Sequence, residues 1–141
     1  MKRRLLVTLL LAGAIAAGIT AVQVYASGGT APIYRTPDGH SCAFGAADTF
    51  DWVGHFHVDE KGATLYGTVV LDGVAAHSTF EITLVQNHPC KTMDVGPLQT
   101  DGHGNGEMSF QAPAVPGASE AWILTFHDHV HQIASTPVPF S

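Results

Sequence analysis

Alternation of hydrophobic and polar residues is the dominant pattern of this chain from residue 50 onward. In residues 50–59 the apolar or small residues Phe50, Trp52, Gly54, Phe56 and Val58 take every second position. This period of two is typical of a β-strand with one buried face. The same alternation, with many β-branched residues, recurs at 65–71 and 80–85. Shorter strand-like segments follow at residues 93–100, 107–111, 121–126 and 133–140.

Turn signals separate these segments and favour an all-β fold. Asp72-Gly73 and the Gly-rich residues 101–106 are hairpin turn signals. Residues 74–88 and 118–136 lack Gly and Pro and have room for a helix, but their alternation favours strands. About seven or eight short strands in one domain predict an antiparallel β-sandwich of the immunoglobulin-like kind. Tryptophans on alternating strands are typical of a core, which is the environment expected for Trp52 and Trp122.

The turn at residues 98–106 carries a short motif, T-D-x-x-G-N-G, formed by Thr100, Asp101, Gly104, Asn105 and Gly106. In this motif the chain resembles the hairpins of small secreted bacterial β-sandwich proteins of uncharacterised function. The resemblance implies a β-sandwich and export. It carries no catalytic residue, because Gly and Asn in such a motif serve to adopt positive φ.

The first 26 residues have the pattern of a signal peptide. Residues 1–4 are basic, residues 5–24 are almost wholly apolar, and Val24-Tyr25-Ala26 ends in a small-x-small pattern. Cleavage after Ala26 is expected, which would leave residues 27–141 as one secreted, extracytoplasmic domain, with 27–30 as a short flexible leader. The alternative is an uncleaved anchor, since 20 apolar residues can also span a bilayer.

Charge excludes several classes of partner. The chain has six basic and twelve acidic residues, for a net charge of −6, and loss of the three basic residues in 1–26 lowers it to −9. A strongly negative domain repels the phosphate backbone, so nucleic acid is not an expected partner. A polybasic attachment to anionic lipid is excluded in the same way, and cleavage of the signal would leave no stable membrane anchor.

Two cysteines suit an oxidising compartment. A disulfide between Cys42 and Cys90 is expected in an exported protein. It would close a loop with 47 residues between the cysteines, which the chain-entropy account values at roughly 4 kcal/mol. The two H-x-C elements leave an alternative open, a zinc site made of His40, Cys42, His88 and Cys90.

Histidine is the unusual component, with nine residues, all after the signal segment. On a strand, His55 and His57 would point the same way and offer two imidazoles to one ion. His127, His129 and His131 are candidates to complete such a site. Zinc or copper is the expected metal, because imidazole suits both. The alternative is that these histidines are polar surface residues of a domain poor in Lys and Arg.

These observations predict a secreted, non-catalytic binding protein that holds zinc or copper through its histidines. The main alternative is an extracellular interaction or structural module that binds a protein or surface partner and no metal. A pH-responsive role is a third hypothesis, because protonation of nine histidines would offset the charge of −9 between about pH 7 and 5. An enzyme is not predicted, since no motif indicates a paired acid and base or an activated nucleophile.

Overall fold

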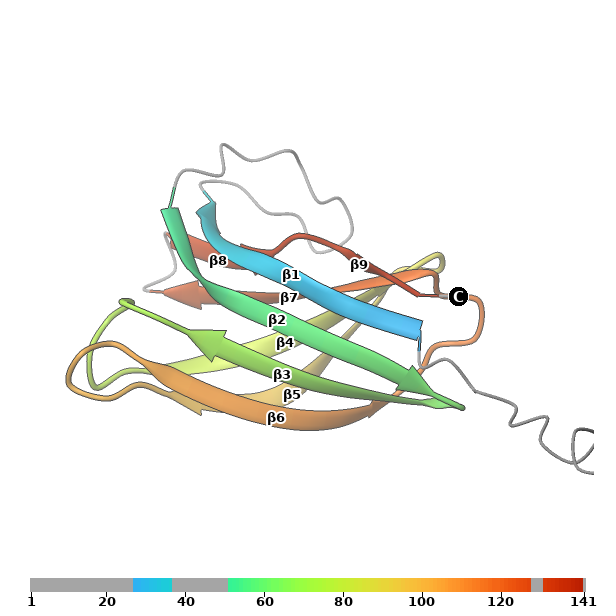
Figure 1. Cartoon of the computed structure of the whole chain (residues 1–141), viewed down its shortest axis with the longest axis horizontal. Coiled ribbons are helices and arrows are strands. Elements are labelled where there is room, and N and C mark those ends of the chain that lie inside the picture. Colours follow the sequence, from blue (N-terminus) through green and yellow to red (C-terminus); the bar gives the residue numbers. More distant parts are fainter. Residues whose placement is uncertain (1–26, 37–50, 128–130, 141) are drawn as a thin grey trace, which may run out of the picture.

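The computed structural model of the chain describes residues 27–36, 51–127 and 131–140 (Figure 1). The expected signal peptide, residues 1–26, lies outside these ranges. Within them the chain forms nine strands and no α-helix. The strands are β1 (Ser27–Thr36), β2 (Asp51–Lys61), β3 (Thr64–Leu71), β4 (Thr79–Asn87), β5 (Lys91–Gln99), β6 (Gly106–Pro113), β7 (Glu120–His127), β8 (His131–Ser135) and β9 (Val138–Pro139). No helix long and apolar enough to cross a membrane occurs in the described ranges.

All strand pairs are antiparallel, and they form one continuous sheet with the order β5-β4-β7-β8-β1-β2-β3-β6, to which β9 adds by pairing with β7. The sheet folds back on itself, so that β2, β3 and β6 lie in front of β4 and β5 (Figure 1). Pairing of β8 with β1 joins the two layers, and the end strands β5 and β6 also contact each other. The predicted all-β, antiparallel class is therefore confirmed, in the form of a nearly closed sheet.

One main hydrophobic core fills the space between the layers. In β3 and β4 the predicted apolar positions are the buried ones, since Leu65, Val69, Leu71, Phe80, Ile82 and Leu84 are all at most 1 % exposed. The ring of Phe110 on β6 stacks on Phe56 of β2, with centroids 6.4 Å apart and planes 8° from parallel. Gly67 of β3 pairs with Phe110, and a Cβ at Gly67 would overlap that ring. The missing side chain therefore makes the stack possible.

A second, smaller hydrophobic cluster lies on the outward side of the back layer. It consists of Val85, Trp122, Leu124 and Ala134, with half-buried Cys90 packed against it. Trp122 is only 2 % exposed, so its predicted burial is confirmed. Because Ala121 and Ile123 belong to the main core, β7 is buried on both faces. The outward side of β7 is therefore buried at Trp122 and Leu124, whereas Phe126 further along the same side is 55 % exposed.

Both predicted turns are present, but neither closes a hairpin, because β3 does not pair with β4 and β5 does not pair with β6. Asp72-Gly73 ends β3, and residues 100–105 connect β5 to β6. In this second turn Asp101 Oδ1 accepts the backbone N–H groups of His103, at 2.8 Å, and Asn105, at 3.0 Å. These two hydrogen bonds favour the ionised carboxylate and lower the pKa of Asp101.

Two further expectations are wrong. Residues 27–30 are not a leader: they begin β1 and pair with β2 from Ser27 opposite Glu60 to Thr30 opposite His57. Trp52 is not a core residue, because it is 55 % exposed. The cause is a β-bulge, since Ile33 pairs with Gly54 whereas Tyr34 pairs with Trp52.

The bulge gives β2 one extra residue, Val53, which breaks the alternation. Val53 and Gly54 are both buried, so the next residue toward the strand start, Trp52, faces outward. Gly54 has a φ of 146°, which L side chains rarely adopt, and a Cβ there would collide with the carbonyl oxygen of Val70. Bulges are common where a side chain has to be redirected.

Candidate functional site

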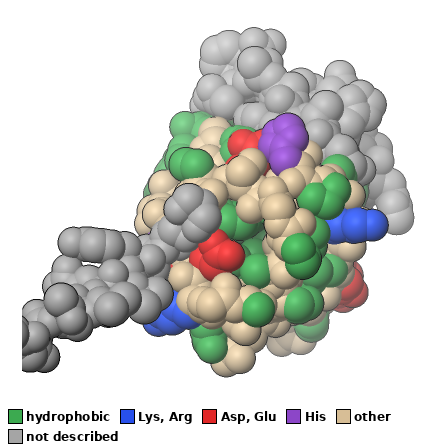
Figure 2. Space-filling view, turned by 90° about the vertical axis from the view of Figure 1, so that its right-hand side faces the viewer, with side chains coloured by type: hydrophobic (Ala, Val, Ile, Leu, Met, Phe, Trp, Pro, Cys, Tyr) green, Lys and Arg blue, Asp and Glu red, His purple; other side chains and the backbone are tan. Residues whose placement is uncertain are grey.

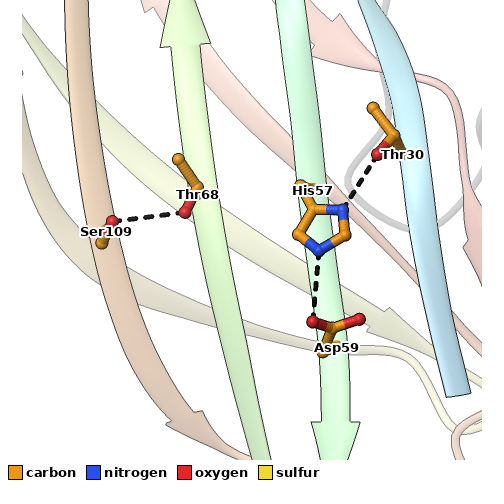
Figure 3. A network of polar contacts seen from close by, with 5 residues as sticks. All are labelled: Thr30, His57, Asp59, Thr68 and Ser109. Carbon is orange, nitrogen blue, oxygen red and sulfur yellow. Dashed lines mark hydrogen bonds and ion pairs between the residues drawn. The ribbon is translucent and has the colours of Figure 1, made fainter. Parts of the chain in front are cut away.

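The outward face of β1, β2, β3 and β6, called the front face below, carries a row of polar side chains. Thr30, His57, Thr68 and Ser109 are register partners on these four neighbouring strands. Figure 3 shows them side by side across the sheet. The hydroxyl groups of Thr68 and Ser109 share a hydrogen bond of 3.2 Å. This polar row is a consequence of register, because each residue takes an outward position of its own strand.

His57 is held between two neighbours within the row. Its Nδ1 lies 2.9 Å from Oγ1 of Thr30, and its Nε2 lies 3.2 Å from Oδ2 of Asp59 (Figure 3). An ionised carboxylate only accepts hydrogen bonds, so Nε2–H donates to Asp59. In the neutral imidazole Nδ1 then accepts the hydroxyl hydrogen of Thr30, and in the protonated imidazole Nδ1–H donates to Oγ1. The two contacts fix the orientation of the ring. A metal ion would have to replace one of these two hydrogen bonds.

Hydroxyl, imidazole and carboxylate are linked here in the order used by hydrolytic triads. However, acyl transfer also needs free N–H donors to stabilise the developing oxyanion. Strand β2 is paired with β1 on one side and β3 on the other around His57, so the backbone N–H groups there belong to the sheet ladders.

Two hollows flank the polar row on the front face. The first, of about 580 Å³, is lined by His57, Asp59, Tyr66, Gly67, Thr68, Ser109, Phe110 and Gln111. Tyr66 is 39 % exposed, and the Lys61 ammonium lies 5.3 Å from the centroid of its ring. The second, of about 440 Å³, lies against the bulge and the two turns and is lined by Trp52, Gly54, His55, Val70, Leu71, Asp72, Asn105, Gly106 and Glu107.

The end of the molecule shown in Figure 2 differs from the front face in the kinds of side chain that it exposes. Hydrophobic side chains predominate there among the coloured groups, with acidic, basic and histidine side chains scattered between them. The front face, by contrast, combines two exposed aromatic rings with a continuous row of polar groups. The front face therefore places aromatic and polar groups side by side, as a binding surface needs.

The histidines of the predicted metal site lie on different parts of the sheet. His55 and His57 project from the same side of β2, with His55 exposed and His57 half-buried. The backbones of His127 and His131 are direct partners across the β7–β8 hairpin, and His129 lies outside the described residues. Among those residues no three His, Cys, Asp or Glu side chains are close enough to hold a metal ion. The five-histidine site remains a prediction.

The strand register shows how far apart the two groups of histidines lie in the sheet. Strand β8 pairs with β1, and β1 lies between β8 and β2. Along β1, Pro32 is opposite His55 whereas Thr36 is opposite Gln132, the neighbour of His131. Four residues of extended chain span about 13 Å. The backbones of His55 and His131 are therefore separated along the strands as well as across them.

The predicted cysteine sites are only partly described. His40 and Cys42 lie outside the described residues, so the disulfide and the alternative zinc site both remain predictions. Cys90 follows β4 and packs against the second cluster. His88 is exposed, with Nε2 3.7 Å from Oε1 of Glu120 and 3.3 Å from Nδ2 of Asn87.

Several residues of the front face were missed by the sequence analysis. Thr68 and Ser109 occupy outward positions of alternating strands, which the sequence pattern indicates, but nothing in it places them opposite each other. Trp52 was assigned to the core because Gly54 gave only a weak signal of a bulge. Comparisons with protein families, curated proteins and solved structures found no match for the chain.

Proposed function

We propose that this chain is an exported, non-catalytic binding module that contacts its partner through the front face. The observation that carries the proposal is the in-register polar row of Thr30, His57, Thr68 and Ser109, flanked by two hollows. We also propose that the nearly closed sheet belongs to the immunoglobulin-like β-sandwich class, for which the two facing layers are the support.

The contrast between the two outward faces supports this proposal. On the back layer the outward side chains of Val85, Trp122, Leu124 and Ala134 are at most 5 % exposed. On the front face Trp52 and Tyr66 are exposed, and large aromatic rings with a polar end are enriched at binding surfaces. The front face therefore offers a partner two exposed aromatic rings beside the polar row, whereas the outward side of the back layer exposes the single ring of Phe126 among the described residues.

The predicted zinc or copper site is the second candidate, and the pair of imidazoles on one side of β2 is the observation that favours it. Against it, both ring nitrogens of His57 are hydrogen-bonded. Native mass spectrometry of the untagged protein separates the candidates. One stoichiometric zinc or copper ion that is retained without added metal, and is lost on mutation of His55 to Ala, would favour the metal site.

The front face is tested by placing a bulky cation in the polar row. Ser109→Arg and Thr68→Arg each introduce one long charged side chain at the centre of the face, where Ser109 is exposed and Thr68 half-buried. Thr79→Arg is the matched control, because Thr79 is an exposed residue of β4 in the back layer. Each variant changes the net charge by the same amount.

Retention on isolated cell envelopes of the producing organism is then measured with labelled protein and unlabelled wild type as competitor. We expect saturable retention that Ser109→Arg and Thr68→Arg weaken about tenfold or more, as disruption of a central contact does, with less than about twofold change for Thr79→Arg. Thermal unfolding of each variant shows that it is folded. Retention that is not saturable, or is equally weakened by all three variants, would contradict the proposal.

A further inference from the structure

The bulge in β2 gives Trp52 a place that its sequence pattern does not indicate. The indole is 55 % exposed, and it lines the hollow of about 440 Å³ between the front face and the two turns. His55, Val70 and Glu107 contribute to the lining from one register row across β2, β3 and β6. An exposed indole beside a hollow of this size is a surface on which a small molecule can rest.

The carboxylate side chains around the hollow give it a negative charge. Asp72 and Glu107 both line it and both are exposed. The nearby basic residue Arg35 is already engaged, with Nη1 3.6 Å from Oδ2 of Asp51 and Nη2 donating to the carbonyl oxygen of Gly73 at 3.1 Å. Two carboxylates therefore line the hollow together with His55 and without a Lys or Arg, and the whole chain is also negative, at −6.

The turns that carry these groups are fixed to each other. The backbone N–H of Gly73 donates to Oδ1 of Asn105 at 3.0 Å, and the N–H of Val74 donates to the carbonyl oxygen of Gly104 at 3.1 Å. On the opposite wall the N–H of Asp72 donates to the carbonyl oxygen of Val53 at 2.7 Å. The hollow is therefore bounded by connected backbone, which reduces the ordering needed when a ligand binds.

We infer that this hollow is a binding site for an organic cation of the quaternary ammonium type, held on Trp52 and drawn in by Asp72 and Glu107. An indole face attracts a cation through its quadrupole, and quaternary ammonium groups are recognised in this way. Val70 lines the hollow and supplies an apolar side chain for methyl groups. A bare metal ion fits less well, because no three ligating side chains of the described residues converge.

This inference rests on the proposed function, because the hollow is part of the front face. It specifies the kind of ligand that one part of that face would bind. The probe is choline chloride, titrated into the full chain and followed by ¹H–¹⁵N nuclear magnetic resonance. The neutral isostere 3,3-dimethylbutan-1-ol has the same shape without the charge. Trp122 is 2 % exposed and its indole signal is the internal control.

We expect choline to shift the indole N–H signal of Trp52 saturably, with a dissociation constant on the order of 1–50 mM for a single exposed site. Binding of the isostere should be at least about fivefold weaker, and added salt should weaken choline binding. Trp52→Leu, followed through the amide signals of Val70 and Gly106, should weaken choline binding about three- to fivefold.

Charge is tested separately from shape. The double variant of Asp72→Asn and Glu107→Gln should weaken choline binding about fivefold, as expected for two exposed charge pairs. Glu81→Gln, on the exposed outward side of β4, is the control carboxylate and should change it by less than about 1.5-fold.

No saturable shift, equal binding of the isostere, or binding unchanged in Trp52→Leu would overturn the inference. If envelope retention still depends on Ser109 in that case, the proposed function stands without this ligand. If choline binds as described but Ser109→Arg leaves retention unchanged, the organic-cation site stands and the wider function fails.

Discussion

Replacement of Gly67 by Ala tests the packing between the layers of the sheet. A Cβ at this position would overlap the ring of Phe110, which is 8 % exposed and stacks on Phe56 with a centroid separation of 6.4 Å. Alanine by itself favours a strand over glycine by about 0.5–1 kcal/mol, whereas overpacking of a filled core typically destabilises by about 1–3 kcal/mol. We therefore expect Gly67→Ala to lower the free energy of unfolding by about 1–2 kcal/mol.

Phe110→Leu should reverse the sign of this effect. The shorter side chain leaves room for the new methyl group, so Gly67→Ala in that background should be neutral or stabilising by about 0.5 kcal/mol. The double-mutant cycle then gives a coupling energy of about 2 kcal/mol. Urea unfolding followed by the fluorescence of buried Trp122 measures all four proteins.

The matched control is Gly62→Ala in the β2–β3 turn. Gly62 has a φ of 62°, and no atom lies within 4 Å of the place that a Cβ would take, so alanine there is penalised by backbone conformation alone, by about 1 kcal/mol. That penalty should be equal with Phe or Leu at position 110. If Gly67→Ala has the same effect in both backgrounds, the explanation by ring overlap is refuted.

Four further predictions concern stability. Thr125 has a buried Oγ1 without a hydrogen-bond partner in the described part of the chain, so Thr125→Val should raise the free energy of unfolding by about 1 kcal/mol. Thr100→Val removes a hydroxyl that is hydrogen-bonded at 2.6 Å to a carbonyl oxygen, so it should lower the free energy of unfolding by about 1–2 kcal/mol. Urea unfolding measures both. The lowered pKa of Asp101 means that its stabilising charge is fully present above the ordinary pKa of 3.8 and is lost as pH falls through the lower folded value; unfolding of wild type and Asp101→Asn at pH 7 and pH 2 should therefore converge in acid. Reduction of the predicted Cys42–Cys90 disulfide should lower the free energy of unfolding by about 4 kcal/mol, and an unfolding midpoint that does not change with reductant would contradict that bond.

Strand positions could be predicted because the buried face of each strand repeats its own local pattern. The alternation in β3 and β4 identifies their core residues directly. The error at Trp52 has a local cause, since the extra residue of the bulge shifts the phase of β2 and a single glycine was the only sign of it. The strand character of residues 27–30 was missed because it depends on pairing with β2, far along the chain.

The polar row could be predicted only in part. Lys61 pairs with Thr64 across a two-residue turn, and this register places His57 opposite Thr68 four residues further along. That step follows from the length of the hairpin turn. The neighbours Thr30 and Ser109 come from strands that are not joined to β2 or β3 by a short hairpin. Their positions depend on how the whole sheet closes.

The layout of the sheet separates binding from stability. Outward residues such as Ser109 and Trp52 are exposed, and substitution of exposed residues usually changes the free energy of unfolding by no more than about 0.5 kcal/mol. The residues beneath them, including Phe110 and Phe56, belong to the main core. Front-face variants should therefore lose binding while keeping the wild-type unfolding midpoint, and Gly67→Ala should lower that midpoint. If every front-face variant lost stability in proportion to binding, the polar row would be a structural feature of the sheet rather than a contact surface.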